Sequence, residues 1–456
     1  MAEQPPPKQG NDMVNGPWDD IAARRDEARA LAAQRREEVA PGASTRTAAS
    51  GPLYGVDSDR ADATKRRLKA LSLGPTLGLL LDTLARQIVA DGISSDRDDQ
   101  GSARLWAPWE ASGMPSRQTA LWREALIDGA AYAVVLPSNG PSVLPLPASR
   151  IACDWGGAEA NEWPVAAVVL RGDGTPWRYL TATEEVDCST GAVLWSGILR
   201  HSPVVRIAPY QALDGECESL VDRLRLPARR YIKTVHDRLL VQHHNSWRVR
   251  TATGLADPGS PEEAERQKAL LEHGDVLTGG EGVQFGSLPE TNLQSLLDAE
   301  KADLGALAAL ASVPSWALSG AQLVNLSADA LAEAKAAERA HLQSLTRAFG
   351  RPVCNLMRLC AAIDGRQSDS EDTTLAVDWR DTEARSLSQA ADALGKLAQT
   401  LGVPAALLWD RIPGVSPSEA AGWREYADAH PDALTSYTQA LAGVDNPGKV
   451  AALEEE

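Results

Sequence analysis

The feature that most constrains this fold is a stripe of apolar residues at helical spacing in the second half of the chain. The stripe consists of Leu331, Ala334, Leu342, Leu345, Phe349, Leu356, Leu359 and Ile363. Intervals near 3.6 residues predict one amphipathic helix, and Ser327 is a suitable N-cap for it. A helix over 327–364 would have about 37 residues and reach roughly 55 Å. Gly350 and Pro352 lie inside it, so we expect a kink near Ala348.

Two shorter helices precede this long helix and enclose a small insert. Pro227 suits the first turn of a helix that ends near Asn245, and Asn292–Ser312 carries a leucine-rich face. For the insert, the pattern predicts a strand at 247–251, a helix at 261–273 and a hairpin that pairs 275–277 with 283–285 around Gly279–Gly282. An uncharged segment with Pro314 and Gly320 separates the second helix from the long one.

Residues 101–216 carry a strand-like pattern after a helical start. Apolar runs of strand length occur at 131–136, 165–171, 177–183, 192–197 and 204–208. Turn signals separate them at 138–140, 172–174 and 189–191. We expect an antiparallel, sheet-rich domain with helices at its edge.

The two ends of the chain are predicted to be mainly helical. An N-terminal tail with the composition of disorder precedes a charged helix at 18–40, and 60–92 is helical with a break at Pro75. A strand is expected at 374–379, followed by helices at 382–401, 404–411, 417–428 and 431–443. The fold class is therefore α+β: a mixed sheet-rich domain, a helix pair with a small α/β insert, a long kinked helix and a helical C-terminal part.

The charge of the chain excludes one mode of nucleic-acid binding. With 62 acidic and 45 basic residues among 456, the formal net charge is −17. A protein that grips DNA through bulk charge is usually basic, because it must neutralise phosphates. One region reverses the sign, with Asp237 as its only acid: its cations are Arg223, Arg225, Arg229, Arg230, Lys233, Arg238, Arg248 and Arg250. This basic cluster is either a solvated helix face or set of salt bridges, or a contact for DNA phosphates or an acidic partner.

The chain lacks the short motifs that mark common enzymes. It contains no G-x-x-x-x-G-K-[ST], no G-x-S-x-G and no H-E-x-x-H. Five widely spaced cysteines do not form a disulfide framework, and the histidines have no zinc spacing. We expect no catalytic residues, no metal and no cofactor. Paired carboxylates at Asp57 and Asp59, and at Asp96, Asp98 and Asp99, keep a carboxylate-based hydrolase open as an alternative.

The order of these elements resembles that of bacteriophage portal proteins, the head-to-tail connector rings of long-tailed phages. The most specific resemblance lies at 311–340, where a short helix ends in a proline turn, an uncharged loop follows and a long helix opens. It rests on Pro314, Leu318, Asn325, Leu326, Ser327 and Ala328. A second resemblance is Val377–Asp381, followed by Arg385, Ser386 and the helix with Gln389–Asp392. The likeness covers roughly residues 50–440.

The resemblance implies a division of the chain into the parts of a portal subunit. Residues 1–49 would be a disordered tail and helix, and 50–217 the wing, completed by 327–381. The stem would be 218–246 and 291–312, and the clip 247–290. The tunnel loop would be 313–326, followed by the long kinked helix 327–364 and the crown at 382–456.

The resemblance also implies a function. The chain would form a ring of about twelve copies at the capsid vertex of a virion, assembled in the host cytoplasm. Double-stranded DNA would be packaged and ejected through its channel, and the terminase, a head-tail adaptor, and capsid and scaffold proteins would dock on it, with no membrane involved. The channel residues would be Ser315, Trp316, Ser319, Gln322 and Asn325. Another ring-forming virion connector component, such as an adaptor, is a second alternative.

Overall fold

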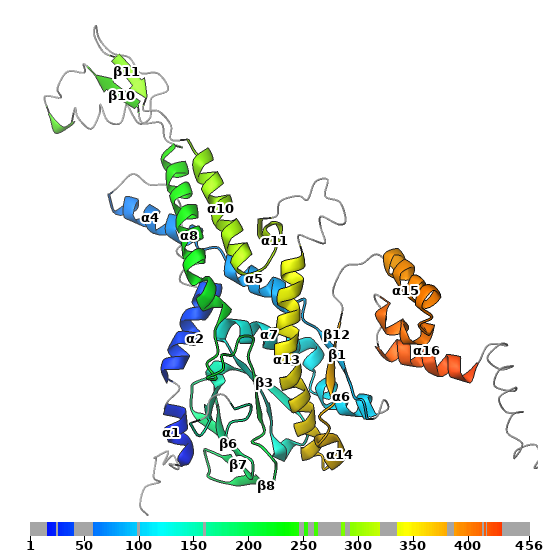
Figure 1. Ribbon diagram of the computed structural model, residues 1–456. Helices are drawn as coiled ribbons and strands as arrows, with labels where there is room; N and C mark the ends of the chain where they lie inside the picture. Colours follow the sequence, from blue (N-terminus) through cyan, green and yellow to red (C-terminus); the bar gives the residue numbers. More distant parts are fainter. Residues whose placement is uncertain are drawn as a thin grey trace, which may run out of the picture. The chain divides into compact units, whose positions relative to one another are not determined.

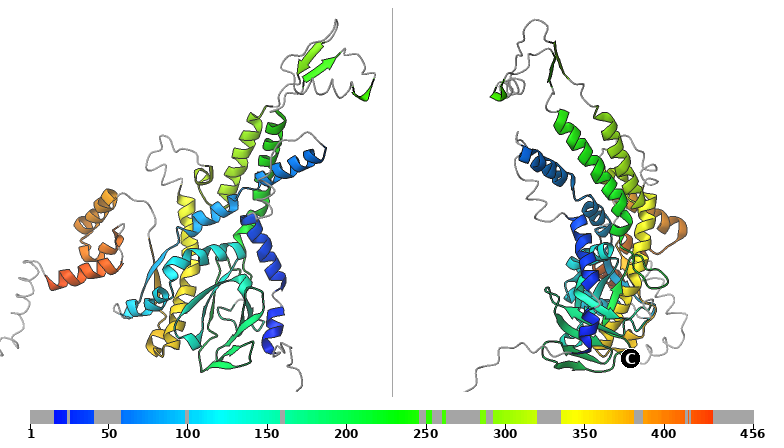
Figure 2. Two further views of the ribbon diagram at one scale, coloured as in Figure 1. Left: turned by 180° about the vertical axis from the view of Figure 1, so that it is seen from behind. Right: turned by 90° about the vertical axis from the view of Figure 1, so that its left-hand side faces the viewer.

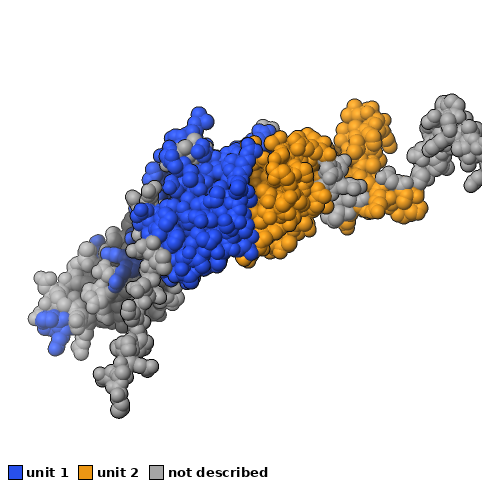
Figure 3. All heavy atoms as spheres, turned by 90° about the horizontal axis from the view of Figure 1, so that it is seen from below, with its two compact units in different colours: residues 1–86, 120–138, 144–349 blue, residues 87–119, 139–143, 350–456 orange. Residues whose placement is uncertain are grey.

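The computed structural model describes residues 16–23, 26–40, 58–97, 101–157, 161–245, 250–253, 260–262, 284–287, 292–319, 335–380, 387–412, 415 and 417–430. The chain forms two compact units, which Figure 3 shows in different colours. The first consists of residues 1–86, 120–138 and 144–349, and the second of 87–119, 139–143 and 350–456. Helices and sheets both contribute, so the predicted α+β class is confirmed.

A five-stranded antiparallel sheet lies in the first unit (Figure 1), and its strand order follows the chain. Its strands are β4 (Ile151–Asp154), β5 (Ala166–Leu170), β6 (Pro176–Thr181), β7 (Glu184–Asp187) and β8 (Val193–Ser196). Every residue of β5 is buried. Ala167 and Val169 pack into one core cluster, while Val168 and Leu170 pack into another. Because side chains alternate between the faces of a strand, the continuous apolar run of β5 forms a wall between two cores.

A second antiparallel sheet has the order β3–β2–β9, formed by β3 (Val143–Pro147), β2 (Ala131–Val135) and β9 (Val204–Ile207). The five strands predicted between 131 and 208 correspond to β2, β5, β6, β8 and β9, whereas β3, β4 and β7 were not predicted. The expected turns at 172–174 and 189–191 are present. They place Gly174 and Gly191 at φ values of 93° and 72°, which glycine adopts without a side-chain clash.

The N-terminal helices are α1 (Pro17–Ala23), α2 (Asp26–Val39), α4 (Ser58–Ser72) and α5 (Thr76–Ala85). The predicted break at Pro75 is confirmed. The prediction that helix continues to 92 is wrong, because the chain turns after Ala85 and forms β1 (Ala90–Ser94). That strand pairs antiparallel with β12 (Ala376–Trp379), and such a distant partner overrides local helix propensity.

One stretch of the described chain, Lys65–Ala85, is long and apolar enough by composition to cross a membrane. Residues 73–75 divide it between α4 and α5, so it is not one continuous helix. In α5, Leu80, Leu81 and Leu84 are at most 1% exposed. The core of the first unit accounts for the apolar character of this stretch.

Three helices follow the sheets: α8 (Leu220–Asn245), α10 (Gln294–Leu310) and α13 (Ala336–Ile363). The prediction that Pro227 opens the first of them is wrong, because α8 starts at Leu220 and holds Pro227 in its interior. Ser219 provides the physical reason: its Oγ accepts hydrogen bonds from the backbone N–H of Val221 (3.1 Å) and Asp222 (3.3 Å), which caps the helix seven residues earlier.

The long helix α13 runs unbroken through Gly350 and Pro352. Leu345, Phe349 and Leu356 of its apolar stripe are fully buried. Its expected beginning near Ser327 lies outside the described residues. The short helix α11 (Ser315–Ser319) stands between α10 and that segment.

The insert between α8 and α10 contributes β10 (Arg250–Thr253) and β11 (Gln284–Ser287), which pair antiparallel. The strands predicted at 247–251 and 283–285 correspond to them. The described partner of β11 is therefore β10. The predicted partner at 275–277, the Gly279–Gly282 turn and most of the helix expected at 261–273 lie outside the described residues.

Helices α6 (Gly101–Ala111) and α7 (Met114–Asp128) lead into β2, and α7 contributes to both units. In the second unit, α14 (Gln367–Ser370) precedes β12, and α15 (Leu387–Leu401) and α16 (Pro417–Ala429) follow it. The helix predicted at 404–411 is instead two short 3₁₀ turns, Ala405–Leu407 and Trp409–Arg411. Helix α15 ends before these turns at Leu401, where Gly402 adopts a φ of 66°, a conformation that commonly ends a helix. The helix expected at 431–443 lies outside the described residues.

Candidate functional site

Helices α8 and α10 lie side by side along their length, as both views in Figure 2 show. Leu224 and Ala228 of α8 are buried, as are Leu304, Leu307 and Ala308 of α10. Burial of such apolar side chains is the main driving force for packing these helices into the fold.

Ion pairs cross between the two helices at matched positions. Arg230 Nε lies 2.7 Å from Asp303 Oδ1, and Arg238 Nε donates to Glu300 Oε2 at 2.5 Å. Between them, Thr234 Oγ1 donates to Asp303 Oδ2 at 2.6 Å. The three α8 residues are four apart and so share one face of that helix. Partly exposed pairs of this kind contribute about 1 kcal/mol or less each, so their main effect is to fix the register of the two helices.

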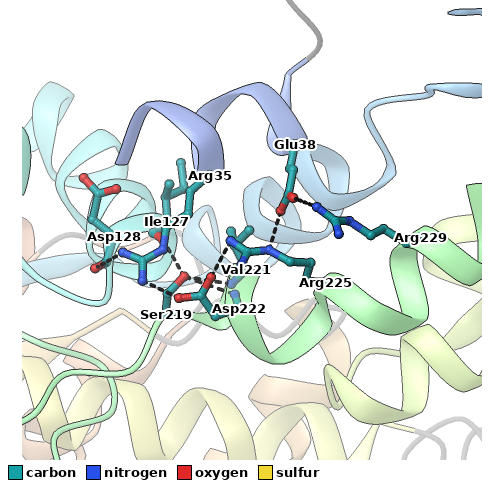
Figure 4. Close-up of polar contacts among 9 residues, drawn as sticks. All are labelled: Arg35, Glu38, Ile127, Asp128, Ser219, Val221, Asp222, Arg225 and Arg229. Atoms are coloured by element: carbon teal, nitrogen blue, oxygen red, sulfur yellow. Dashed lines mark hydrogen bonds and ion pairs between the residues drawn. The ribbon is translucent and has the colours of Figure 1, made fainter. Parts of the chain in front are cut away.

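A second set of polar contacts holds the base of α8 (Figure 4). The Asp222 carboxylate pairs with Arg35 of α2 and, at 2.6 Å, with Arg225 of its own helix. Glu38 of α2 pairs with Arg225 at 2.9 Å and with Arg229 at 2.8 Å. The N-terminal helix α2 is thereby joined to the first turns of α8.

The same helix is joined to α7 through a buried carboxylate. The Asp128 side chain is 1% exposed and lies 2.7 Å from Arg36, which also contacts Glu124 at 2.6 Å. Burial raises the pKa of Asp128, and the Arg36 guanidinium opposes that rise. Arg35 Nη1 donates to the Asp128 backbone carbonyl at 3.0 Å. Ion pairs and hydrogen bonds thus join helices α2, α7 and α8 to one another.

These contacts bear directly on the basic cluster predicted from the sequence. All six members with described side chains have acidic partners within the chain: Arg223 with Glu218, Arg225 and Arg229 with Glu38, Arg230 with Asp303, Lys233 with Asp237, and Arg238 with Glu300. Arg248 lies outside the described residues, and Arg250 belongs to β10, whose side chains also lie outside them. Contact of this cluster with DNA or a partner stays a prediction.

The expected channel residues lie partly in α11. Ser315 and Ser319 are exposed, and Trp316 is half-buried. The Lys335 ammonium lies 5.7 Å from the centre of the Trp316 ring, within range of a cation–π contact. Gln322 and Asn325 lie outside the described residues, so the structure brings three of the five together.

A further cluster next to α11 was not predicted. Tyr210, which follows β9, meets His341 of α13, and Arg223 of α8 lies over the Tyr210 ring. The sequence signal for it is slight: His341 is a polar residue next to Leu342 on the apolar stripe of α13. The adjacent pair His243 and His244 lies elsewhere, at the end of α8.

The described site joins elements to one another through ion pairs and aromatic contacts. Among the residues that the structure describes, no group of three or more His, Cys, Asp or Glu side chains could hold a metal ion. These contacts position helices relative to one another, which is a structural role within the chain.

Comparison with known families identifies the kind of structural protein. The chain matches the family model described as phage portal protein, SPP1 Gp6-like, over residues 73–430. Because the match spans well over half of the chain, this protein belongs to the phage portal family, and it is a portal-type connector component of a virion. The resemblance noted in the sequence is thereby confirmed.

Three solved structures are among those to which the chain is similar. The virion of a native gene transfer agent particle has a chain 15% identical, with 80% of this chain and 99% of that chain covered and a TM-score of 0.46. A chain in the neck of the native particle is 16% identical, with 83% of this chain and 98% of that chain covered and a TM-score of 0.47. A chain in the neck of the empty particle is 15% identical, with 81% of this chain and 98% of that chain covered and a TM-score of 0.42. A search of curated proteins finds no match.

Proposed function

We propose that this chain is the subunit of a ring of about twelve copies at the capsid vertex, and that double-stranded DNA is packaged and ejected through the channel of that ring. The match to the phage portal family over residues 73–430 is the observation that carries the proposal. The ring has no enzymatic role of its own in this proposal, and a separate terminase supplies the energy for packaging.

The parts of the subunit follow the element order. We assign the wing to 50–217 with 327–381, the stem to 218–246 and 291–312, and the clip to 247–290. The tunnel loop is 313–326, the long helix 327–364 and the crown 382–456. The register-fixing ion pairs between α8 and α10 support the stem assignment, because a channel wall must keep its shape while DNA moves past it.

The charge arrangement supports a channel that passes DNA without holding it. Each tight contact between a cation and a phosphate adds salt-dependent affinity and slows sliding. The described cations of the basic cluster already have acidic partners in the same chain, and the chain as a whole carries −17. Ser315, Trp316, Ser319, Gln322 and Asn325 would line the constriction with uncharged groups that touch the DNA backbone without ionic capture.

The other partners are assigned by part. The clip, which contains β10 and β11, would meet the terminase during packaging and the head-tail adaptor afterwards. The wing and crown would face the capsid and scaffold proteins, and assembly would take place in the host cytoplasm. No membrane is part of this proposal.

The oligomeric state of the purified full-length protein tests the proposal. Native mass spectrometry and negative-stain microscopy should detect closed rings of many copies. A protein that remains a monomer at micromolar concentration would contradict it.

A further inference from the structure

His341 connects three segments of the first unit at one point. Its Nδ1 lies 3.1 Å from the backbone carbonyl oxygen of Ala311, and its Nε2 lies 2.6 Å from the Tyr210 hydroxyl oxygen. The Arg223 guanidinium lies 4.2 Å from the centre of the Tyr210 ring, and Glu218 pairs with Arg223. The end of α10 and the loop after β9 therefore both meet the start of α13, and the start of α8 reaches this point through the Tyr210 ring.

The chain at Ala311 has the geometry of a helix terminus that changes direction sharply. Ser312 has φ of +56° and is the one non-glycine residue with positive φ in the described chain. The Ser312 N–H donates to the Ala309 carbonyl at 3.1 Å, and the Val313 N–H donates to the Ala308 carbonyl at 2.9 Å. This is a Schellman motif with serine in place of the usual glycine. His341 satisfies the carbonyl of Ala311, the last residue before that turn.

Ala311 and His341 are 30 residues apart, so their hydrogen bond joins the described ends of the segment between them. The contact between Trp316 of α11 and Lys335, just before α13, joins the same two ends a second time. The first contact thus holds the end of α10, directly before α11, at α13, and the second holds α11 itself beside Lys335.

The hydrogen bonds fix which nitrogen of the neutral His341 ring carries the proton. A carbonyl oxygen can only accept, so Nδ1 carries the proton and donates to Ala311. The neutral ring then accepts the Tyr210 O–H at Nε2. A second proton on Nε2 would remove that acceptor and place a cation near Arg223.

We propose that His341 is the positioning residue that holds α11 against the start of α13, with Tyr210 and Arg223 fixing its ring. This inference rests on the proposed function, in which those two ends flank the channel constriction. We call His341, Ala311, Tyr210 and Arg223 the latch. In every subunit of the ring, the latch would hold α11 at the same position relative to the start of α13.

The surroundings of His341 make the latch dependent on pH. Burial and the positive charge of Arg223 lower the pKa of His341 from its usual 6.5, although the Ala311 carbonyl opposes this. The other charged groups nearby are Glu218, which is paired with Arg223, and the buried Glu338 one turn earlier on α13. Because the folded pKa is lowered, the latch is at full strength above pH 6.5 and weakens as the pH falls through the folded pKa.

Hydrogen exchange of the full-length protein, read by mass spectrometry and corrected for intrinsic rates, tests the inference. His341→Ala should raise exchange about tenfold in residues 313–319 and 335–340 at pH 8, since one hydrogen bond of ordinary strength is lost. The α8 amides at 224–240 should not change. Tyr210→Phe should have a smaller effect in the same peptides. Leu213→Ala, at a fully exposed position in the same loop, is the matched control and should have none.

The His341→Asn variant distinguishes the hydrogen bond to Ala311 from the packing of the His341 ring. Its amide N–H can still donate to Ala311, but the side chain does not titrate. Protection should therefore be largely kept at pH 8 and should not fall between pH 8 and pH 5, whereas that of the wild-type protein should fall several-fold. Wild-type exchange in His341→Ala, or equal loss of protection in the Asn and Ala variants, would overturn the inference. Ring formation, measured separately by native mass, reports on the proposed function alone.

Discussion

The surroundings of Asp187, at the end of β7, favour the charged form of its carboxylate. Its Oδ1 accepts a hydrogen bond from the Ser189 N–H at 2.9 Å and another from the Ser189 hydroxyl, and Arg178 pairs with it. The Ser189 hydroxyl is the largest cause that lowers the pKa of Asp187 to about 2. The contacts of Asp187 with Ser189 and Arg178 therefore contribute to the stability of the β6–β7–β8 region.

We expect Asp187→Asn to remove an acid-dependent component of that stability. The folded pKa lies below the unfolded one, so the stabilisation is present above about pH 4 and is lost as the pH falls through 2. The variant should be less stable by about 1–2 kcal/mol at pH 6, and this difference should vanish near pH 2. Hydrogen exchange of the β6 and β7 amides at several pH values measures it, and a difference that does not depend on pH would contradict the prediction.

At the scale of elements, the α8–α10 pair depends on charges that face one another across the helices. Arg238→Glu or Glu300→Arg alone places like charges opposite each other, and each should raise hydrogen exchange in α10 about two- to five-fold. The exchanged pair, Arg238→Glu with Glu300→Arg, should restore most of the protection. Lys233→Ala, which removes an exposed contact within α8, should have little effect on α10. A double variant as unprotected as the single ones would contradict this role.

The segment after α11 allows a direct test of sliding. Replacing Gln322 and Asn325 with Lys should leave rings intact but impair DNA packaging, because the new cations would grip phosphates. The defect should lessen as salt rises, since such contacts release counterions. Replacing both residues with Ser keeps the segment neutral and serves as the matched control. Normal packaging by the lysine variant at low salt would refute the sliding argument.

Elements with strong local patterns could be predicted, and those formed by distant partners could not. The continuous apolar runs of β2, β5 and β9 predict strands correctly. In contrast, β7 reads Glu184–Asp187 and resembles a polar loop, yet Glu185 is fully buried, accepts a hydrogen bond from the Ser138 N–H at 2.9 Å and lies 3.4 Å from Arg178. A charged residue that pairs inside the core carries no apolar signal.

The candidate site shows the same division. The second helix of the pair was predicted from its leucine-rich face, and the first from a helical pattern in which Pro227 suited the first turn. The acidic partners of its cations were not, because Asp303 and Glu300 lie more than 60 residues away from Arg230 and Arg238 in the sequence. The latch at His341 depends on a tyrosine 131 residues earlier, which a pattern read along the chain cannot pair with it.

For the whole molecule, net charge sets the conditions for assembly. Subunits of −17 repel one another over a distance that shrinks from about 30 Å at 0.01 M salt to about 8 Å at 0.15 M. We therefore expect the fraction of protein in rings to increase as sodium chloride rises over that range. Sedimentation velocity at fixed protein concentration measures this. Rings that dissociate as salt rises would show instead that opposite charges hold neighbouring subunits together.

The packing of α1 on the five-stranded sheet has a practical consequence for anyone who shortens this protein. Trp18 and Ile21 complete the core cluster that contains Val168 and Leu170, yet the family match begins only at residue 73. A truncated protein that begins at residue 73 would expose the apolar side chains of β5 that α1 covers, and it would be prone to aggregation. Tags and truncations are better placed ahead of residue 16.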